Sequence, residues 1–431
     1  MLLVACARLG VVQNPIIPVL RAEVGAIVGQ LGSRLLVVPE RWAGYDHGSA
    51  ARALGVPVLA VDLETPPGPG LRLPMGPVGA LPPPPAASGE CRWIYFSSGT
   101  TAEPKGARHS DASVVAGSSG MVDAMGMQSG EVYPIAWPIA HVGGVAMLSA
   151  VLRAGGTLVL FERFDPATTG ERMAAHRPTI LGSATPFFQV YVAAQRRAGA
   201  EPLFPDLRVV VGGGAPTPTA VNDEVAEVLG VAGVVASWGL TEFPAATSES
   251  PEDPAVGTTV GRPVAGVSVR VVDGELRLKG PQCFLGYVDS TLDRDAFDDE
   301  GWFRTGDLGS VDDDGRVRIE GRSKDVIIRN AENISSLEVE GVVLQHPAVA
   351  DVAVIGVPHE RTGEQVVAVV VLAPGGEVTL ARLVEHCRDA GLARYKCPER
   401  LEIVDALPRS PMGKVLKRSI VLTSHVDPAT T

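Results

Sequence analysis

The 431 residues of this chain are 45% hydrophobic and 20% charged, a composition that excludes disordered and fibrous proteins. The length exceeds what one hydrophobic core usually holds, so we expect two domains. The net charge of −12 argues against a nucleic-acid-binding protein, which needs a basic face, although local lysines and arginines can still bind an anionic cofactor.

The cysteines and the apolar runs indicate in which cellular compartment the protein is expected. The five cysteines are scattered without a C-x-x-C pair or a metal-site spacing, which indicates reduced thiols and a cytoplasmic protein. No apolar run reaches the roughly 18 residues that a transmembrane helix needs. The apolar start, residues 1–6, lacks a basic region and is soon followed by Arg8, so we expect it to belong to the folded protein.

Residues 1–65 alternate apolar runs with a helical pattern. The spacing predicts a helix over 20–31 and short buried strands over 34–39 and 56–62, an alternation typical of α/β proteins. The stretch 66–87 is dense in Pro and Gly, which exclude a helix or a central strand. We expect it to be an extended surface connection.

Between 111 and 239, helical patterns and strand-like runs alternate regularly. The helical patterns cover 111–125, 143–153, 166–176, 186–198 and 218–229. The strand-like runs cover 157–161, 179–182, 207–211 and 232–236. Strands separated by helices of this length predict a largely parallel, helix-covered sheet, and ligands bind beyond the carboxyl ends of such strands.

After residue 257 the pattern changes to short β runs joined by tight turns, at 267–272, 275–279 and 316–320. A smaller α+β pattern follows, with strand-like runs at 352–357 and 366–372 and a helix over 380–390. We therefore expect an α/β protein of layered, largely parallel sheets with a β-rich subdomain at about 257–321. The large domain would cover 1–321 and a small α+β domain would cover 322–431.

The segment 95–110, Y-F-S-S-G-T-T-A-E-P-K-G-A-R-H-S, joins a strand-like run at 93–96 to the helical pattern that begins at Asp111. A strand that opens into a Ser, Thr and Gly loop presents backbone N–H groups and hydroxyls to a phosphate. It is not a Walker A loop, because Pro104 and Gly106 replace residues that such a loop requires. On these residues alone, a phosphate loop and a Gly-rich surface turn have equal support.

The run S-S-G-T-T-A-E-P-K-G resembles the phosphate loop of adenylate-forming enzymes, the superfamily of acyl-CoA synthetases, luciferases and peptide-synthetase adenylation domains. Ala102 stands where that family usually has Gly. The resemblance implies that ATP phosphates are bound by Ser97, Ser98, Gly99, Thr100, Thr101 and Lys105.

The run V-V-V-G-G-G-A-P at 209–216 resembles the family's G-G-A-P loop, which approaches adenine. Glycines there let the backbone come close to a base, although an ordinary tight turn has the same sequence. The resemblance implies adenine contacts from Gly213, Gly214, Ala215 and Pro216.

The run S-W-G-L-T-E at 237–242 resembles the family motif Y-G-x-T-E, with Trp in place of Tyr. The resemblance places Trp238 and Gly239 beside adenine and Thr241 at a phosphate, and it makes Glu242 a catalytic ligand of Mg²⁺. A carboxylate beside a triphosphate would repel it without a bridging cation. The alternative interpretation is a strand end with a surface glutamate, and alone the motif is of moderate specificity.

Two later motifs resemble the ribose site and the hinge of the family. In G-W-F-R-T-G-D at 301–307, Asp307 takes the place of the aspartate that binds both ribose hydroxyls, and a carboxylate can accept two such bonds. In G-R-S-K-D at 321–325, Arg322 becomes a second ribose ligand and Lys324 the hinge of a mobile small domain. Each motif alone would be a charged β-turn, and their order along the chain favours the functional interpretation.

The run P-R-S-P-M-G-K at 408–414 resembles the family motif P-x-S/T-x-x-G-K, whose catalytic lysine corresponds to Lys414. Its ammonium would bridge the attacking carboxylate and the α-phosphate. In isolation, a solvated lysine in a tail would be the better interpretation.

The preceding loop, 327–340, has Asn330-Ala331 where the family usually has Gly-Gly. In the family this loop lies against the pantetheine arm, so Ala331 narrows the space expected there.

The run W-P-I-A-H-V-G-G at 137–144 follows a strand and begins a helix. A lone histidine is more often structural, but in the family this position lines the acyl pocket. The resemblance implies a substrate site of His141, Gly143, Gly212 and Leu240. The glycines suggest room for an apolar chain, and aryl acids are not excluded.

The resemblance covers essentially the whole chain and starts inside the family's first subdomain, so the N-terminus is shortened either in a compact variant or by a mis-assigned start codon. It implies an acyl-CoA synthetase that uses ATP, Mg²⁺ and CoA to activate a carboxylic acid, fatty or otherwise apolar, through acyl-AMP, with release of AMP and pyrophosphate. Two alternatives remain: a ligase that loads a carrier protein, and a truncated, non-catalytic nucleotide- or acyl-binding protein. No fused carrier follows Lys414, which favours CoA. The sequence gives no oligomeric state.

Overall fold

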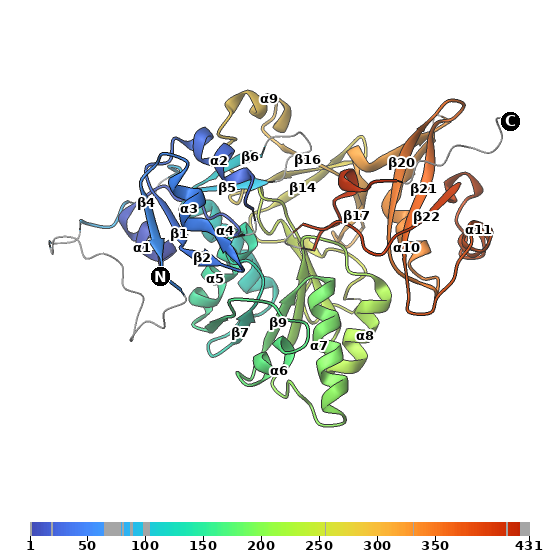
Figure 1. Ribbon diagram of the computed structural model, residues 1–431, viewed down its shortest axis with the longest axis horizontal. Coiled ribbons are helices and arrows are strands. Elements are labelled where there is room, and N and C mark those ends of the chain that lie inside the picture. The colour runs from blue at the N-terminus through green and yellow to red at the C-terminus, as the bar shows by residue number, and fades with distance from the viewer. Residues whose placement is uncertain are drawn as a thin grey trace. The chain divides into compact units, whose positions relative to one another are not determined.

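The computed structural model describes residues 2–18, 20–63, 79, 82–86, 89–97, 104–254, 256–330, 332–410 and 413–422 (Figure 1). The chain forms two compact units, Met1–Ala112 with Phe284–Asp293 and Ser113–Cys283 with Arg294–Thr431. The boundary at 321/322 is a different division and stays a prediction. In the part that the structure describes, no helix is long and apolar enough to cross a membrane.

The first unit contains short helices and two-stranded sheets. Its described helices are α1 (Leu2–Leu9), α2 (Glu23–Leu31) and α3 (His47–Arg52). Its described strands are β1 (Leu36–Pro39), β2 (Arg41–Trp42), β3 (Tyr45–Asp46), β4 (Val58–Val61), β5 (Trp93–Ser97) and β6 (Lys105–His109). The predicted helix and two strands before residue 65 are confirmed as α2, β1 and β4, and β1 and β4 pair in parallel.

The strand β6 corrects the predicted connection from strand to loop to helix. It pairs antiparallel with β5, so that Ser97 lies opposite Lys105. On its other edge the backbone N–H of Val288 donates to the carbonyl of Gly106 at 2.8 Å. Half of the ladder of β6 therefore comes from a segment about 180 residues away in the sequence, which the local pattern does not contain.

The second unit contains the predicted parallel sheet. Its strand order is β13-β12-β11-β10-β9, in which β9 (Ile180–Ser183), β10 (Val209–Gly213) and β11 (Val234–Trp238) are parallel, and β12 (Thr247–Ser248) and β13 (Arg262–Pro263) are antiparallel. A separate parallel pair is β7 (Val132–Ile135) and β8 (Thr157–Leu160). The apolar run of β10 is buried on both faces, as parallel strands covered by helices require.

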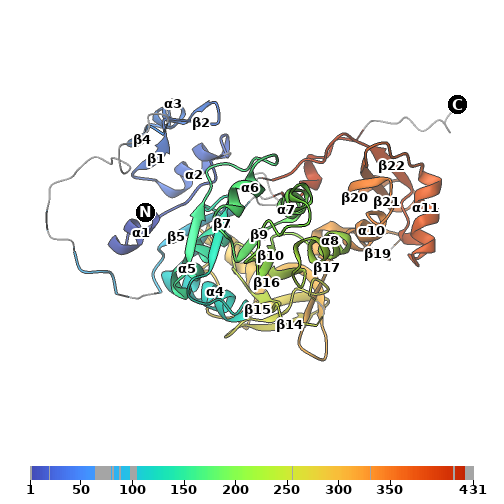
Figure 2. The ribbon, with the colours of Figure 1, turned by 90° about the horizontal axis from the view of Figure 1, so that it is seen from below.

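The predicted helices of this region are confirmed. They are α4 (Asp111–Ala124), α5 (Val142–Ala154), α6 (Thr169–Ala174), α7 (Thr185–Ala198) and α8 (Thr219–Leu229). Helix α7 packs on β9 and α8 on β11, and the two helices lie side by side (Figure 2). The core between helices and sheet includes the fully buried Phe188 and Tyr191.

The β-rich subdomain is confirmed as an antiparallel sheet of β14 (Ser268–Val272), β15 (Glu275–Lys279), β16 (Phe303–Val311) and β17 (Val317–Arg322), with α9 (Asp293–Ala296) before β16. The short 3-10 helix η2 (Ser323–Asp325) leads out of β17.

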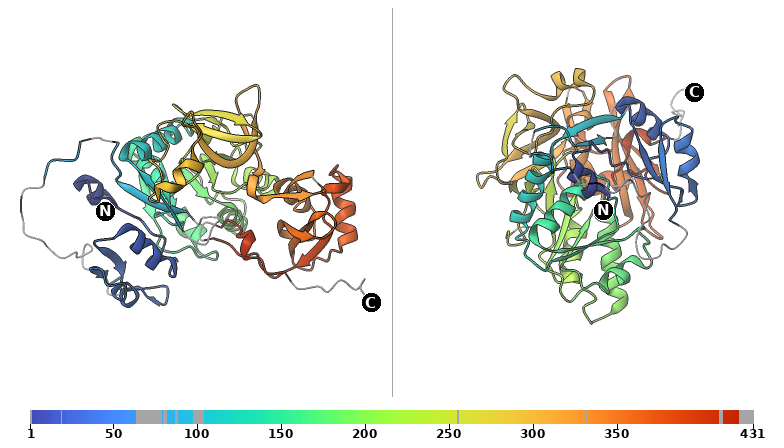
Figure 3. Two further views of the ribbon diagram at one scale, coloured as in Figure 1. Left: turned by 90° about the horizontal axis from the view of Figure 1, so that it is seen from above. Right: turned by 90° about the vertical axis from the view of Figure 1, so that its left-hand side faces the viewer.

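The α+β segment that follows is drawn orange to red in Figure 3. Its sheet contains β18 (Val326–Arg329), β19 (Glu332–Ser335), β20 (Val349–His359), β21 (Gly363–Leu372) and β22 (Arg400–Ile403), and its helices are α10 (Ser336–Val343) and α11 (Leu380–Asp389). Helix α10 was not predicted, although Ser335 and Glu338 have the S-x-x-E spacing of a capped helix start. The Ser335 hydroxyl accepts the backbone N–H of Glu338 at 3.2 Å.

Candidate active site

Two predicted adenine segments meet at one end of the parallel sheet. Strands β10 and β11 are in register there, with Gly213 opposite Ser237, so the loop after β10 begins beside Trp238. Gly214 has a positive φ of 81°, and a side chain at this position would meet nothing within 4 Å. The two segments are therefore brought together at the edge of the sheet where ligands bind in such folds.

A tight turn after β11 carries the predicted phosphate and metal residues. The backbone N–H of Leu240 donates to the carbonyl of Phe243 at 3.0 Å, and the N–H of Phe243 donates back at 3.1 Å. Thr241 and Glu242 form the middle of this turn, and Glu242 is only 8% exposed. At Gly239 a Cβ would lie 2.5 Å from the Ala245 nitrogen, so the motif needs glycine because the backbone folds back on itself.

A single carboxylate at this turn is suited to magnesium only together with phosphates. Among the residues with described positions, no group of three His, Cys, Asp or Glu side chains could hold a metal ion. In proteins Mg²⁺ usually keeps several water ligands and binds through one or two carboxylates together with substrate phosphates. Glu242 could supply one such carboxylate.

The predicted ribose residues form a compact polar cluster. Asp307 in β16 lies opposite Arg322 in β17, and the Arg322 Nε is 2.8 Å from Asp307 Oδ1. The indole Nε1 of Trp238 donates to Asp307 Oδ2 at 2.9 Å. Asp307 is 2% exposed, and its Oδ1 is ion-paired but has no well-aligned hydrogen bond among the described residues. This buried acceptor could receive a ribose hydroxyl.

The Lys414 motif forms a small hairpin whose geometry explains its sequence. Arg409 and Val415 are bridged, and the backbone N–H of Ser410 donates to the Lys414 carbonyl at 2.8 Å. The Ser410 hydroxyl accepts the Lys414 N–H at 3.2 Å, and Gly413 has a positive φ of 81° that favours glycine. The serine and the glycine of the motif therefore shape the turn that presents the lysine.

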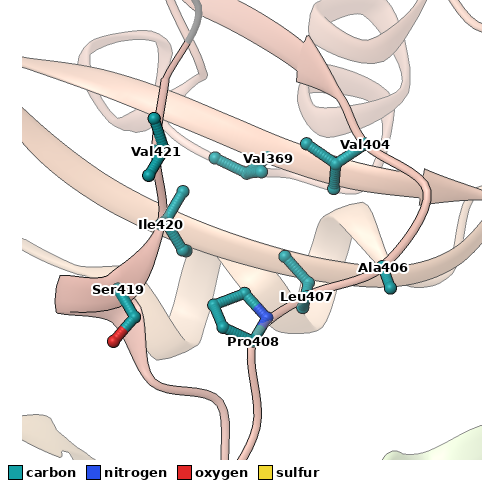
Figure 4. A pocket seen from close by; sticks show the side chains of 8 residues that line it. All are labelled: Val369, Val404, Ala406, Leu407, Pro408, Ser419, Ile420 and Val421. Atoms are coloured by element: carbon teal, nitrogen blue, oxygen red, sulfur yellow. The ribbon is translucent and has the colours of Figure 1, made fainter.

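Both arms of this hairpin are anchored on the sheet of the α+β segment. Leu407 and Pro408 on one arm and Ile420 on the other line an apolar hollow of about 320 Å³ against Val369 and Val404 (Figure 4).

Two ion pairs add to this apolar anchoring. Lys417 lies 2.6 Å from Glu340 in α10 and donates to the Ser336 hydroxyl at 2.7 Å, while Arg409 lies 2.5 Å from Asp351. The sequence pattern did not identify these anchors.

Lys414 lies in a cationic neighbourhood. Desolvation by the surrounding protein, followed by the charges of Arg322 and Lys324, lowers the pKa of Lys414 to about 8, against the opposing effect of Asp307. Burial also lowers the pKa of Lys324, with Arg322 as the next cause. A side chain at Gly413 would be 3.6 Å from Pro186 at the start of α7, so the hairpin reaches the helical layer. Grouped cations of this kind favour a polyphosphate ligand.

We expect the activity of the proposed enzyme to fall as the pH rises above about 8. In the predicted role of Lys414, its charged ammonium stabilises phosphate charge, and it loses its proton as the pH passes its lowered pKa. The pH profile of kcat/KM for ATP, which reports the free enzyme, measures this. Lys414→Arg stays charged, so its residual activity should not fall in this range. An identical fall in both proteins would contradict the assignment.

His141 caps helix α5. Its Nδ1 accepts the backbone N–H of Gly143 at 3.1 Å, and burial lowers the pKa of its imidazole to about 4, so the ring is neutral at pH 7. The structural role is therefore confirmed, and the contact of His141, Gly143 and Leu240 with an acid stays a prediction.

Two of the glycines that suggested room for an apolar chain are required for a different reason. A Cβ at Gly144 would lie 2.5 Å from the Ile139 carbonyl oxygen, and one at Gly212 would lie 2.6 Å from Val234. Close packing, rather than open space, requires glycine at these two positions.

The phosphate loop is only partly within the structure. Ser98, Gly99, Thr100 and Thr101 lie outside the described residues, as does Ala331. Ser97 ends β5 and Lys105 begins β6, with the Lys105 ammonium 5.8 Å from the centre of the Tyr287 ring.

Asn330, which replaces a glycine of the family motif, has a φ of 49°. Asparagine tolerates this left-handed conformation better than most residues, so the exchange preserves the backbone path. Its N–H donates to the Thr362 carbonyl at 2.8 Å.

Comparison with known proteins gives the family. The AMP-binding enzyme family matches residues 1–288, and the AMP-binding enzyme C-terminal domain matches 338–414. A medium-chain fatty-acid–CoA ligase of Escherichia coli is 32% identical over 340 residues, which are 75% of this chain and 59% of the ligase. A sulfoacetate–CoA ligase of Cupriavidus necator is 30% identical over 445 residues, covering 97% of this chain and 84% of the ligase.

A 3-[(3aS,4S,7aS)-7a-methyl-1,5-dioxo-octahydro-1H-inden-4-yl]propanoyl:CoA ligase of Mycobacterium tuberculosis is 36% identical over 330 residues, 75% of this chain, and the chain spans only 64% of that relative. The solved structure of ATP-bound MatB from Rhodopseudomonas palustris is 29% identical, with a TM-score of 0.84 over 97% of this chain and 84% of MatB. The solved structure of apo MatB is 28% identical, with a TM-score of 0.73 over the same fractions of the two chains. The chain therefore belongs to the AMP-binding enzyme family.

Proposed function

We propose that this protein is an AMP-forming acyl-CoA synthetase. A carboxylate oxygen of the acid attacks the α-phosphorus of ATP, and the bond to the departing pyrophosphate breaks. The CoA thiolate then attacks the acyl carbonyl carbon of the acyl-AMP, and AMP leaves. The observation that carries this proposal is the cluster of Trp238, Asp307, Arg322 and Lys414, which come from the parallel sheet, the β-rich subdomain and the C-terminal hairpin.

The first step depends on charge neutralisation and positioning rather than on proton transfer. The carboxylate is already a nucleophile, so no general base is needed. The Lys414 ammonium would stabilise the charge that concentrates on the α-phosphate, and Asp307 with Arg322 would fix the ribose. Thr241 would contact the phosphates from the turn after β11. Bound at Glu242, Mg²⁺ would neutralise charge on the departing pyrophosphate.

The proposed acid is fatty or otherwise apolar. The similarity to the medium-chain fatty-acid–CoA ligase supports this class. A short polar acid is the second candidate, because protein atoms fill the space at Gly144 and Gly212, and because the similarity to the sulfoacetate–CoA ligase covers nearly the whole chain.

Acid-dependent ATP–pyrophosphate exchange tests the proposal. A series of straight-chain acids of increasing length, with sulfoacetate and an aryl acid, should show exchange that depends on one class. Offering CoA or a purified carrier protein to the active enzyme then identifies the acceptor. ATP binding without exchange for any acid of the series would show a nucleotide-binding protein instead.

We expect Glu242→Gln to raise the Mg²⁺ concentration for half-maximal exchange by about tenfold or more, an equilibrium change equivalent to about 1.4 kcal/mol. The amide keeps the shape of the side chain but lacks the charge that attracts the cation. The exposed Glu227 on α8 offers a matched control, and Glu227→Gln should leave the Mg²⁺ titration unchanged. A wild-type titration curve for Glu242→Gln would remove the metal role.

A further inference from the structure

We infer that Trp238 positions the Asp307 carboxylate through its indole N–H, so that this ring contributes to recognition of the ribose and not only of the base. The inference rests on the proposed function in assuming that the ligand is ATP. It assigns Trp238 as a positioning residue, because it acts through Asp307.

Both partners of this hydrogen bond are held in place. Trp238 ends β11, pairs with Thr247 of β12, and accepts the Ala246 N–H at its carbonyl at 2.8 Å. Its side chain is almost completely buried, at 9% exposed, and Asp307 is 2% exposed. Because neither side chain can move into solvent, the 2.9 Å bond between Nε1 and Oδ2 is a fixed feature of the site.

The bond joins two different sheets. Trp238 belongs to the five-stranded sheet that carries the turn with Glu242, whereas Asp307 belongs to the antiparallel sheet that ends at Arg322. Register within either sheet cannot set the distance between these two side chains. The indole N–H therefore fixes the carboxylate relative to the sheet that would hold the base and the phosphates.

The two carboxylate oxygens of Asp307 have different surroundings. Oδ2 accepts the indole N–H, while Oδ1 lies 2.8 Å from the Arg322 Nε without a well-aligned hydrogen bond. A rotation of the carboxylate would break the first contact and lengthen the second. Leaving a buried acceptor without a hydrogen bond is unfavourable, and a ribose hydroxyl at Oδ1 would satisfy it.

The contact depends on tryptophan at this position. The motif that this segment resembles has tyrosine, whose ring has no N–H donor and whose hydroxyl lies at a different point of the side chain. If the ring served only to stack on adenine, its N–H would be incidental, and phenylalanine would replace it with little effect on the ribose.

Equilibrium binding of three nucleotides to the full chain separates these two roles. ATP, 2′-deoxy-ATP and 2′,3′-dideoxy-ATP are titrated into the wild type, Trp238→Phe, Asp307→Ala and the double variant. We expect Trp238→Phe to bind ATP about tenfold more weakly, the scale of a hydrogen bond to a charged group. Binding of 2′,3′-dideoxy-ATP should be nearly unchanged, and the double variant should be no weaker than Asp307→Ala, since the two residues act as a unit.

The controls separate the possible failures. Equal weakening of all three nucleotides in Trp238→Phe would show stacking alone and overturn the inference. A wild-type protein that binds no ATP would overturn the proposed function as well, so the two failures are distinguishable. If Trp238→Phe does not fold, as judged by its melting temperature, Trp238→Tyr supplies the same comparison, because it also lacks the indole N–H.

Discussion

Lys414→Ala should lower acid-dependent ATP–pyrophosphate exchange by about 10²–10³-fold, the effect of removing one preorganised charge stabiliser. Lys414 is presented by a hairpin shaped by Ser410 and Gly413, so its backbone position is set before ATP binds. Alanine leaves that backbone intact and removes only the charge. The second step, transfer of pre-made acyl-AMP to CoA, should retain most of its rate, because the proposed rotation about Lys324 would have moved Lys414 away from the α-phosphate by then.

Both half-reactions are measured separately for this variant. Lys279→Ala is a suitable control, because Lys279 is an exposed lysine in the β-rich subdomain, and it should leave both rates unchanged. Equal loss of the two half-reactions in Lys414→Ala would mean that one static site performs both steps.

Lys324→Pro should have the opposite effect, with adenylation preserved and thioester formation lowered by about 10²-fold. Lys324 lies in the 3-10 helix η2 between the β-rich subdomain and the α+β segment. Proline fixes φ near −65°, which suits a 3-10 helix, and it resists the rotation that we propose to follow adenylation. A steric cost of about 3 kcal/mol at the pivot corresponds to roughly 10²-fold.

The matched control is Lys324→Ala, which removes the same charge but leaves the backbone free to turn. It should retain thioester formation if rotation, and not the ammonium, is what this position supplies. Melting temperatures of both variants are needed, because proline also disfavours a helical conformation at Ser323. Loss of thioester formation in both variants would contradict the assignment of Lys324 as a hinge.

Local patterns predicted the elements that depend on local sequence. The helices α4 to α8 and the strands β8 to β11 follow from hydrophobic period and length. Strand β6 was missed because its second edge is completed by residues near Val288, which are distant in sequence.

Side-chain contacts between sheets could not be predicted from the sequence either, because they too join residues that are distant along the chain. Motif matches named both Trp238 and Asp307, but their bond joins residues 69 positions apart on different sheets. The glycine pattern was misleading at Gly144 and Gly212, because a missing side chain indicates either open space or a close neighbour, and only packing distinguishes them.

The anchoring of the Lys414 hairpin has a consequence for the entropy of the reaction. Ordering a free tail around a substrate would cost about 1–2 kcal/mol for every residue immobilised. Here Lys417 is tied to Glu340, Arg409 to Asp351, and the apolar arms lie on the sheet, so this ordering is complete once the segment has folded. In the rotation that we propose, the hairpin would then move with the α+β segment as a rigid body, and each turnover would order the lysine at the cost of that single rotation.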